Sequence, residues 1–265
     1  MLSIIIILIL FTSCNKENII DLSKQEGLLK SIKISYNTLP VSYEYTFSYY
    51  SLDGRLRKVL INEKDSIVFT YDTSGSIEMN LYPSGKRWII SKTGSKITGI
   101  NEILPGEIIQ ASYRFVYGGD NIDSIFEPDQ YPIAENIKYY GIVYDGKNYS
   151  SSLLSYIFYN FSTPIYHTDE LQEYTYTTRT YDNRLVMQGI HSRINPGWES
   201  FPFIDPLFCM GLNGYNAYTP NGNLVKSWNE VQYQYAENSN GQISTMKLIT
   251  PATPDPDVIF RMNYY

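Results

Sequence analysis

Apolar and polar residues alternate with a period of two over several segments of the chain. In residues 41–49 every second residue is apolar or aromatic and the residues between them are polar, and residues 231–235 and 174–177 repeat this pattern. The spacing places the aromatic side chains on one face of a β-strand. The polar alternate positions predict that the other face contacts water, which is typical of antiparallel sheets. Helical periodicity is weak, and residues 203–210 predict no more than one helical turn in a proline-rich loop.

The predicted strands lead into a recurring turn. It combines a tyrosine, a glycine four residues later and an aliphatic residue two positions after the glycine, as in residues 50–56, 71–77 and 218–224, with a longer copy at 235–243. Glycine adopts the positive φ that a tight turn requires. A spacing of about 20 residues between such turns accommodates one hairpin per repeat. The glycines of this series are Gly54, Gly75, Gly94, Gly222 and Gly241.

These patterns predict an all-β domain over residues 28–265. We expect an antiparallel meander of repeated β-hairpins that forms a curved sheet, either sandwich-like or open barrel-like. The composition agrees, because 43% hydrophobic and only 18% charged residues exclude a disordered chain. A net charge of -6 and a pI near 5.0 argue against nucleic acid as a partner. Two histidines and two cysteines leave little from which to build a metal site, so we expect neither metal nor cofactor.

The N-terminal residues indicate the compartment. Residues 4–11 form an apolar run that is too short for a membrane span of about 20 residues and fits a secretory signal. The run ends at Leu10-Phe11-Thr12-Ser13-Cys14, which resembles the bacterial lipobox. The resemblance implies cleavage before Cys14 and lipid attachment to it. We therefore expect a signal peptide at 1–13, a tether at 14–27 and an anchor in the outer membrane, on its periplasmic or its surface face.

The hairpin turns also resemble known proteins. The Tyr-Asp-x-x-Gly-x-Ile/Leu turn resembles the Tyr-Asp repeats of Rhs-type shells. The whole layout resembles a group of uncharacterised Bacteroidetes lipoproteins with β-repeat domains, and the likeness covers most of residues 28–250. The matching features are Cys14, Tyr71-Asp72 with Gly75, Ile194-Asn195-Pro196 and residues 233–243. This resemblance implies a fold and a place in the cell envelope, and it implies no activity.

Motifs for catalysis are absent from the sequence. It has no Gly-x-Ser-x-Gly elbow, no His-Glu-x-x-His and no phosphate-binding loop. A glycosidase needs only two carboxylates, but near pairs arise by chance among 27 acidic residues, so we expect no enzyme activity. We expect His167 and His191 to be structural or surface residues, and Cys209 to be a buried apolar residue. The candidate acid groups are Asp169-Glu170 with Glu173, Glu127 with Asp129, and Asp255 with Asp257.

Binding is the function that the sequence favours. Trp88, Trp198 and Trp228 offer flat faces for stacking on sugar rings or on a partner's side chains, and the more common alternative for such residues is packing in the core or at its rim. We therefore predict a lipid-anchored envelope protein that acts as a non-enzymatic binding or structural module for a glycan or a protein. The alternatives are a glycan-directed hydrolase with a carboxylate pair, and a carrier whose tyrosine faces enclose an apolar ligand.

Overall fold

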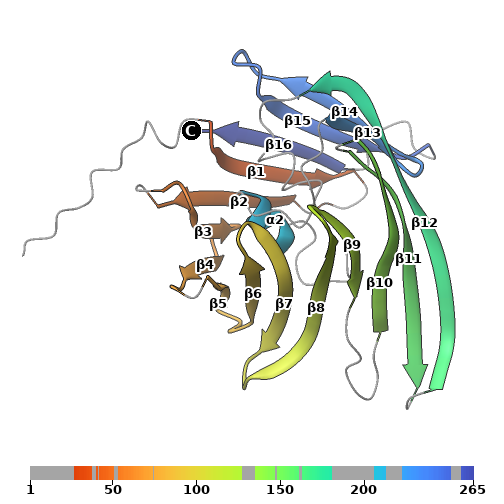
Figure 1. Cartoon of the computed structure of the whole chain (residues 1–265). Helices are drawn as coiled ribbons and strands as arrows, with labels where there is room; N and C mark the ends of the chain where they lie inside the picture. Colours follow the sequence, from red (N-terminus) through yellow and green to blue (C-terminus); the bar gives the residue numbers. More distant parts are fainter. Residues whose placement is uncertain are drawn as a thin grey trace, which may run out of the picture.

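The computed structural model contains sixteen strands and a short helix, α2 (Pro206–Leu212), in the part of the chain that it describes (Figure 1). The described residues are 27–265 except 38–39, 41, 51–52, 74, 127–134, 147, 161–162, 181–205, 213–222 and 252–257. The first eight strands are β1 (Leu29–Tyr36), β2 (Ser42–Tyr49), β3 (Leu56–Ile61), β4 (Asp65–Tyr71), β5 (Ile77–Tyr82), β6 (Arg87–Thr93), β7 (Lys96–Leu104) and β8 (Ile108–Gly118). The others are β9 (Asn121–Phe126), β10 (Glu135–Asp145), β11 (Asn148–Asn160), β12 (Thr163–Thr180), β13 (Asn223–Trp228), β14 (Val231–Glu237), β15 (Ile243–Ile249) and β16 (Val258–Tyr264).

The strands form one antiparallel meander that closes into a barrel. Each strand pairs with the next along the chain, and β1 pairs with β16. At this closure Ile32 faces Met262 and Ile34 faces Phe260. The predicted all-β meander of hairpins is confirmed, and of the two predicted architectures the barrel is the one that forms. Pairing of the first and last strands closes the sheet and removes the free edges of an open one.

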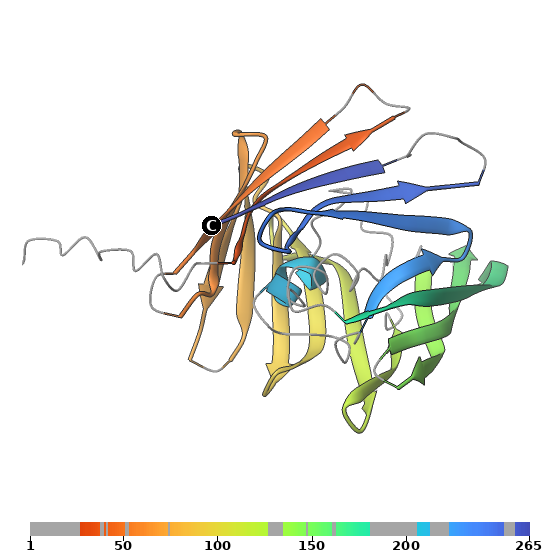
Figure 2. The same cartoon turned by 90° about the horizontal axis from the view of Figure 1, so that it is seen from above.

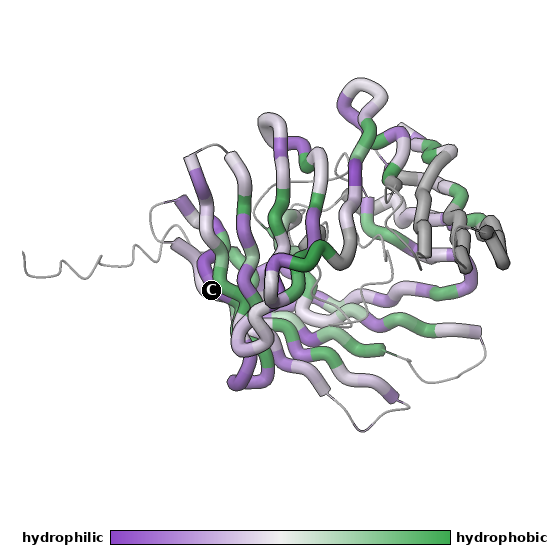
Figure 3. The backbone as a smooth tube through the Cα atoms, turned by 90° about the horizontal axis from the view of Figure 1, so that it is seen from below, coloured by the Kyte–Doolittle hydropathy of each residue, from purple (hydrophilic) through white to green (hydrophobic). Residues whose placement is uncertain are grey.

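The alternation in the sequence separates the two faces of the barrel wall. In β2 the Tyr45 and Phe47 side chains are fully buried, whereas Glu44 and Ser48 are exposed. The buried inward positions of the other strands join them in one apolar core. Figure 3 shows the result as hydrophobic and hydrophilic positions that follow one another along the strands. The interior of this barrel is therefore built as an ordinary hydrophobic core.

The glycine turns lie together at one end of the barrel. Consecutive strands run in opposite directions, so all turns that follow even-numbered strands are at the same end, which we call the glycine rim. The amide of Gly54 donates to the carbonyl of Tyr50 at 3.0 Å, and that of Gly241 to Asn238 at 3.1 Å. The predicted glycine turns are confirmed, because Gly54, Gly75, Gly94 and Gly241 all have a positive φ. Gly222 lies outside the described residues.

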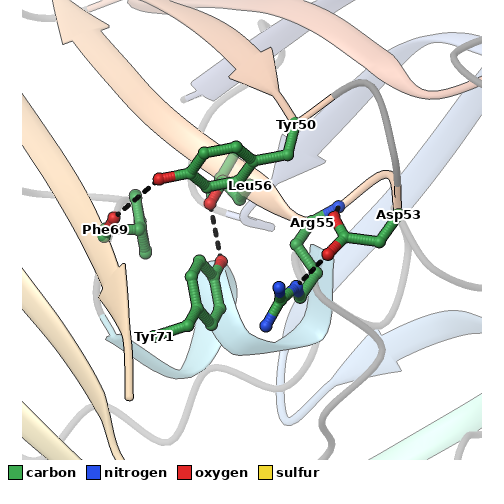
Figure 4. A network of polar contacts seen from close by, with 6 residues as sticks. All are labelled: Tyr50, Asp53, Arg55, Leu56, Phe69 and Tyr71. Carbon is green, nitrogen blue, oxygen red and sulfur yellow. Dashed lines mark hydrogen bonds and ion pairs between the residues drawn. The ribbon is translucent and has the colours of Figure 1, made fainter. Parts of the chain in front are cut away.

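A tyrosine near the end of an even-numbered strand fastens each of several hairpins at the glycine rim. Figure 4 shows Tyr71, whose hydroxyl donates to the carbonyl of Leu56 at 2.6 Å. The bonded carbonyl belongs to the residue two or three positions after the preceding glycine of this rim. We call this bond the tyrosine latch. It recurs as Tyr49–Leu29, Tyr117–Ile97, Tyr144–Ile122, Tyr235–Val225 and Tyr264–Ile243, at 2.9, 2.6, 3.4, 2.7 and 2.7 Å.

Helix α2 lies inside the barrel, although it comes between β12 and β13 in the sequence (Figure 2). Its Cys209 and Met210 are fully buried and belong to the same core as the inward strand residues. The prediction that Cys209 is a buried apolar residue is thus confirmed. The helix extends beyond the single turn predicted within residues 203–210, and its apolar residues fill part of the interior of a wide barrel.

Candidate functional site

Lys86, Trp88 and Glu102 form a buried polar cluster on the inner face of the wall. Trp88 on β6 faces Glu102 on β7, and its indole nitrogen donates to Glu102 Oε2 at 3.0 Å. Lys86 Nζ lies 2.5 Å from Glu102 Oε1 and 5.2 Å from the centre of the Trp88 ring. Trp88 is 3% exposed. Its ring therefore packs in the core and offers no face to a ligand.

Glu102 is the buried acid of this cluster, and its surroundings give it a structural role. Among the described residues it is the only acidic side chain that is buried. Each of its carboxylate oxygens has a donor, and the ammonium group of Lys86 neutralises its charge. A buried ion pair needs such hydrogen bonds to offset the cost of removing its charges from water, and here both carboxylate oxygens already have partners within the protein. A hydrolase of the predicted kind would instead need two acids that face the same substrate.

Most of the candidate acids and histidines fall on parts that the structure leaves undescribed. Glu173 is exposed on β12. The side chains of Asp169, Glu170 and His167, on the same strand, and the residues Glu127, Asp129, His191, Asp255 and Asp257 lie outside the described ones. Within the described part, no group of three histidine, cysteine or acidic residues could hold a metal ion.

Trp228 is half-buried on the inner wall at the end of β13. Its indole nitrogen donates to Gln172 Oε1 at 2.8 Å, and Gln172 is itself only 6% exposed. The Tyr174 ring, in register across the strand pair, is nearly parallel to the indole at 16°, with the ring centres 6.3 Å apart. The hydrogen bond fixes the orientation of the indole while part of its ring remains accessible. Trp198, the third candidate for stacking, lies outside the described residues.

Trp228 belongs to a row of half-buried aromatic side chains that follows the inner wall. Trp228 pairs with Val231, and Tyr233, two residues farther along the same strand, continues the row in register through Leu248 and Val258 to Tyr36. Tyr36 then meets Tyr43 edge to face, with ring centres 6.4 Å apart. We call the aromatic members of this row the aromatic arc: Tyr174, Trp228, Tyr233, Tyr36 and Tyr43.

The arc lies at the end of the barrel opposite the glycine rim. Tyr36 ends β1 and Trp228 ends β13, and odd-numbered strands end at this far rim. The next row toward the glycine rim ends at the half-buried Tyr43, and its other members Met246, Phe260 and Ile34 are only 1%, 4% and 1% exposed. Access to the inner wall is therefore greater at the far rim than deeper in the barrel.

The outer face of the wall is polar and charged over β15, β16, β1 and β2, whereas β8, β10 and β12 carry the exposed apolar residues Val116, Val143 and Leu171. Across β2, β1, β16 and β15 the outward row consists of Glu44, Lys33, Arg261 and Thr245, and the three charged residues are exposed. A transmembrane β-barrel has the opposite polarity, with an apolar band outside and a polar interior. One lysine or arginine that faces lipid at the midplane costs about 2–4 kcal/mol. The polarity of the outward row over these four strands suits contact with water.

The N-terminal predictions concern residues 1–26, which lie outside the described residues. Cleavage after Ser13, lipid attachment at Cys14 and the tether at 14–27 therefore stay predictions. None of the described helices is long and apolar enough to cross a membrane.

Sequence reasoning missed the aromatic arc as a unit. The alternation placed Tyr43, Tyr174 and Tyr233 on strand faces, but it could not show that their strands are neighbours. β12 and β13 are joined by more than 40 residues, from Thr180 to Asn223, and nothing local in the sequence specifies their pairing. An alignment of aromatic positions near predicted strand ends is the one signal in the sequence that points to this rim.

No family model matches the sequence, and neither does any curated protein. Among solved structures, a porin-like protein from Bacteroides vulgatus is 12% identical, with a TM-score of 0.62 over 90% of this chain and 98% of that one. A porin-like protein from Bacteroides uniformis is also 12% identical, with a TM-score of 0.57 over 91% and 98%. TcdB2-TccC3 aligns with a TM-score of only 0.20. The chain thus has the β-barrel fold of these two porin-like Bacteroides proteins.

Proposed function

We propose that this chain is a lipid-anchored protein of the outer membrane whose barrel stands in the aqueous phase and acts as a non-enzymatic binding or structural module. The polarity of the wall carries the proposal. Glu44, Lys33 and Arg261 face outward in one row, while the inward rows are apolar. Such a barrel is stable in water, so its attachment to a membrane has to come from outside the barrel. Lipid on Cys14 would provide that attachment.

The ends of the described chain suit a tether. The amide of Gly27 donates to the carbonyl of Tyr265 at 3.3 Å, so the tether joins the barrel at the glycine rim beside the C-terminus. The thirteen steps from Cys14 to Gly27 reach at most ~45 Å when extended. That length would hold the barrel clear of the lipid headgroups and leave the far rim directed away from the membrane.

The described side chains favour binding over catalysis. The buried carboxylate of Glu102 is neutralised by Lys86 and bonded to Trp88, so it has no free oxygen to act as acid or base. The aromatic arc, by contrast, presents partly accessible rings in a fixed arrangement. Aromatic rings with polar edges are common contact groups in binding sites.

Cell fractionation tests the anchor. We expect the wild type to sediment with membranes and to need detergent for release. The variant Cys14→Ala, and a chain whose residues 1–14 are replaced by a cleavable secretory signal without a cysteine, should lose lipid, and the second should be recovered in the soluble fraction. Cys209→Ala is the matched control and should stay with the membranes.

Two results would contradict the proposal in different ways. Membrane association of the chain without residues 1–14 would remove the case for a lipid anchor. If that chain folded only in detergent, the wall would face lipid and the argument from polarity would fail. We expect cooperative unfolding in plain buffer, measured by circular dichroism.

A further inference from the structure

We propose that the aromatic arc binds a neutral oligosaccharide chain at the far rim. This inference rests on the proposed binding function and adds the chemical class of the ligand. The arc consists of Tyr174, Trp228, Tyr233, Tyr36 and Tyr43.

The length of the arc selects an extended ligand. Its members lie on strands β12, β13, β14, β1 and β2, and Leu248 on β15 and Val258 on β16 fill the row between them, so the arc spans seven neighbouring strands of the closed sheet. Six spacings of about 4.8 Å between strands give an arc of ~29 Å. A single small molecule would contact only part of such a row, whereas an oligosaccharide can place successive rings along it.

The chemistry of the arc matches a sugar more closely than an acyl chain. Tyrosine and tryptophan combine an apolar face with a polar edge, and a sugar ring has the same combination. The buried amide of Gln172 fixes the indole of Trp228 at 2.8 Å, so the platform is preorganised. Below the arc, Met246 and Phe260 close the wall at 1% and 4% exposure. A ligand would therefore lie across the wall and not extend down into it.

A peptide is the less suitable occupant of this barrel. Peptides commonly bind a sheet by adding a strand to an exposed edge. The described sheet has no free edge, because β1 pairs with β16. A peptide would have to rely on side-chain contacts alone.

The charge near Trp228 favours a neutral glycan. The turn after Trp228 carries the exposed Glu230, and the amide of Asn229 in this turn donates to the carbonyl of the exposed Glu173 at 2.8 Å. These two carboxylates border the arc, and the chain as a whole has a net charge of -6. An acidic polysaccharide would meet like charge on approach.

The test is binding of the full chain to an array of neutral and acidic oligosaccharides. The protein is kept in lauryldimethylamine oxide, because detergents with maltoside headgroups would themselves present sugar. We expect binding to neutral chains of several sugars and weaker binding to acidic ones. Affinity for the best neutral chain is then measured by calorimetry for the wild type and the variants.

The variants separate stacking from folding. Trp228→Ala and Tyr233→Leu should each weaken binding about tenfold. If the Trp228→Ala chain fails to fold, Tyr233→Leu still tests the arc, because leucine keeps a large apolar side chain at that position. Trp228→Phe should retain part of the affinity. Tyr82→Ala is the matched control, because Tyr82 is 53% exposed and lies outside the arc. Its affinity should equal that of the wild type.

The results that would overturn the inference are distinct from a failure of the anchor. Absence of binding to every neutral glycan, or wild-type affinity in folded Tyr233→Leu and Trp228→Phe chains, would refute it. Preference for acidic chains would refute the argument from charge. Capture of random peptides through Trp228, with no glycan bound, would make the arc a peptide site and leave the binding module in place.

Discussion

The tyrosine latches make the barrel sensitive to alkaline pH. Burial raises the pKa of the Tyr49 hydroxyl well above its ordinary value of about 10, and Tyr265 nearby adds to this effect. Burial likewise raises the pKa of Tyr235, with contributions from Tyr233 and Tyr176. Both hydroxyls donate to strand carbonyls, at 2.9 Å to Leu29 and 2.7 Å to Val225. The fold therefore keeps these two phenols protonated.

The direction of the effect follows from linkage. A group whose pKa is raised in the folded state contributes its full stability below the pKa of the unfolded state and loses it as the pH rises toward the folded pKa. Below pH 10 both states hold the proton and nothing changes. At pH 11 the unfolded chain releases it, so each buried phenol lowers the free energy of unfolding by about 1.4 kcal/mol. Tyr49 and Tyr235 together lower it by about 3 kcal/mol between pH 8 and pH 11.

The double variant Tyr49→Phe/Tyr235→Phe checks this reasoning. At pH 8 it should be less stable than the wild type by about 2–3 kcal/mol, because two carbonyls lose their donors. At pH 11 its free energy of unfolding should approach that of the wild type, because it no longer releases the two protons. Urea unfolding at several pH values, followed by tryptophan fluorescence, measures both, with the exposed Tyr82→Phe as control. Parallel curves for wild type and double variant from pH 8 to 11 would refute the argument.

Three further substitutions test the fold locally. Tyr71→Phe removes the 2.6 Å latch to Leu56 but keeps the ring, so the free energy of unfolding in urea should fall by about 1–2 kcal/mol, and an unchanged value would count against the latch. Lys86→Met leaves the buried carboxylate of Glu102 without its cation, so we expect a loss of about 3–5 kcal/mol in the same assay, partly restored by adding Glu102→Gln. A loss below 1 kcal/mol would mean that the pair is solvated. Gly241→Ala meets open space at a φ of +75°, so thermal unfolding should show only the backbone cost of about 1–2 kcal/mol, and equal stability would contradict the turn geometry.

The hairpins could be predicted from the sequence because their determinants are local. An alternating strand and a turn glycine lie within about ten residues of each other, as in residues 41–54, and both features were placed correctly. The closure of the barrel has no local signal. It depends on pairing between Ile32 and Met262, which are far apart in the chain. The choice between sandwich and barrel therefore stayed open until the register of all strands was known.

The buried ion pair between Lys86 and Glu102 could not be predicted from the sequence, because register shifts interrupt the alternation of inward and outward residues on β7. Glu102 lies between the polar Asn101 and the apolar Ile103, and by alternation alone it could face either side. The register shifts between Ser91 and Lys92, and again between Glu102 and Ile103, so strict alternation fails along β7. A β-bulge of this kind changes which residues face inward. As a result Glu102 points into the core beside Trp88, a residue that the sequence offered as a ligand platform.

The high tyrosine content follows from the width of the barrel combined with its polarity. Eight strands enclose an interior that side chains can fill, whereas sixteen leave an aqueous channel in porins. A wide barrel with apolar inner walls cannot leave its interior to water without exposing that surface, so it needs large side chains and an internal element to cover it. Tyrosine supplies a large ring and, at the glycine rim, a hydroxyl that satisfies a strand carbonyl, as Tyr71 does for Leu56. Helix α2 supplies the internal element through the buried Cys209 and Met210. By this reasoning α2 is part of the core and not a movable plug, because withdrawing it would expose the apolar wall that an outward-polar barrel has to cover.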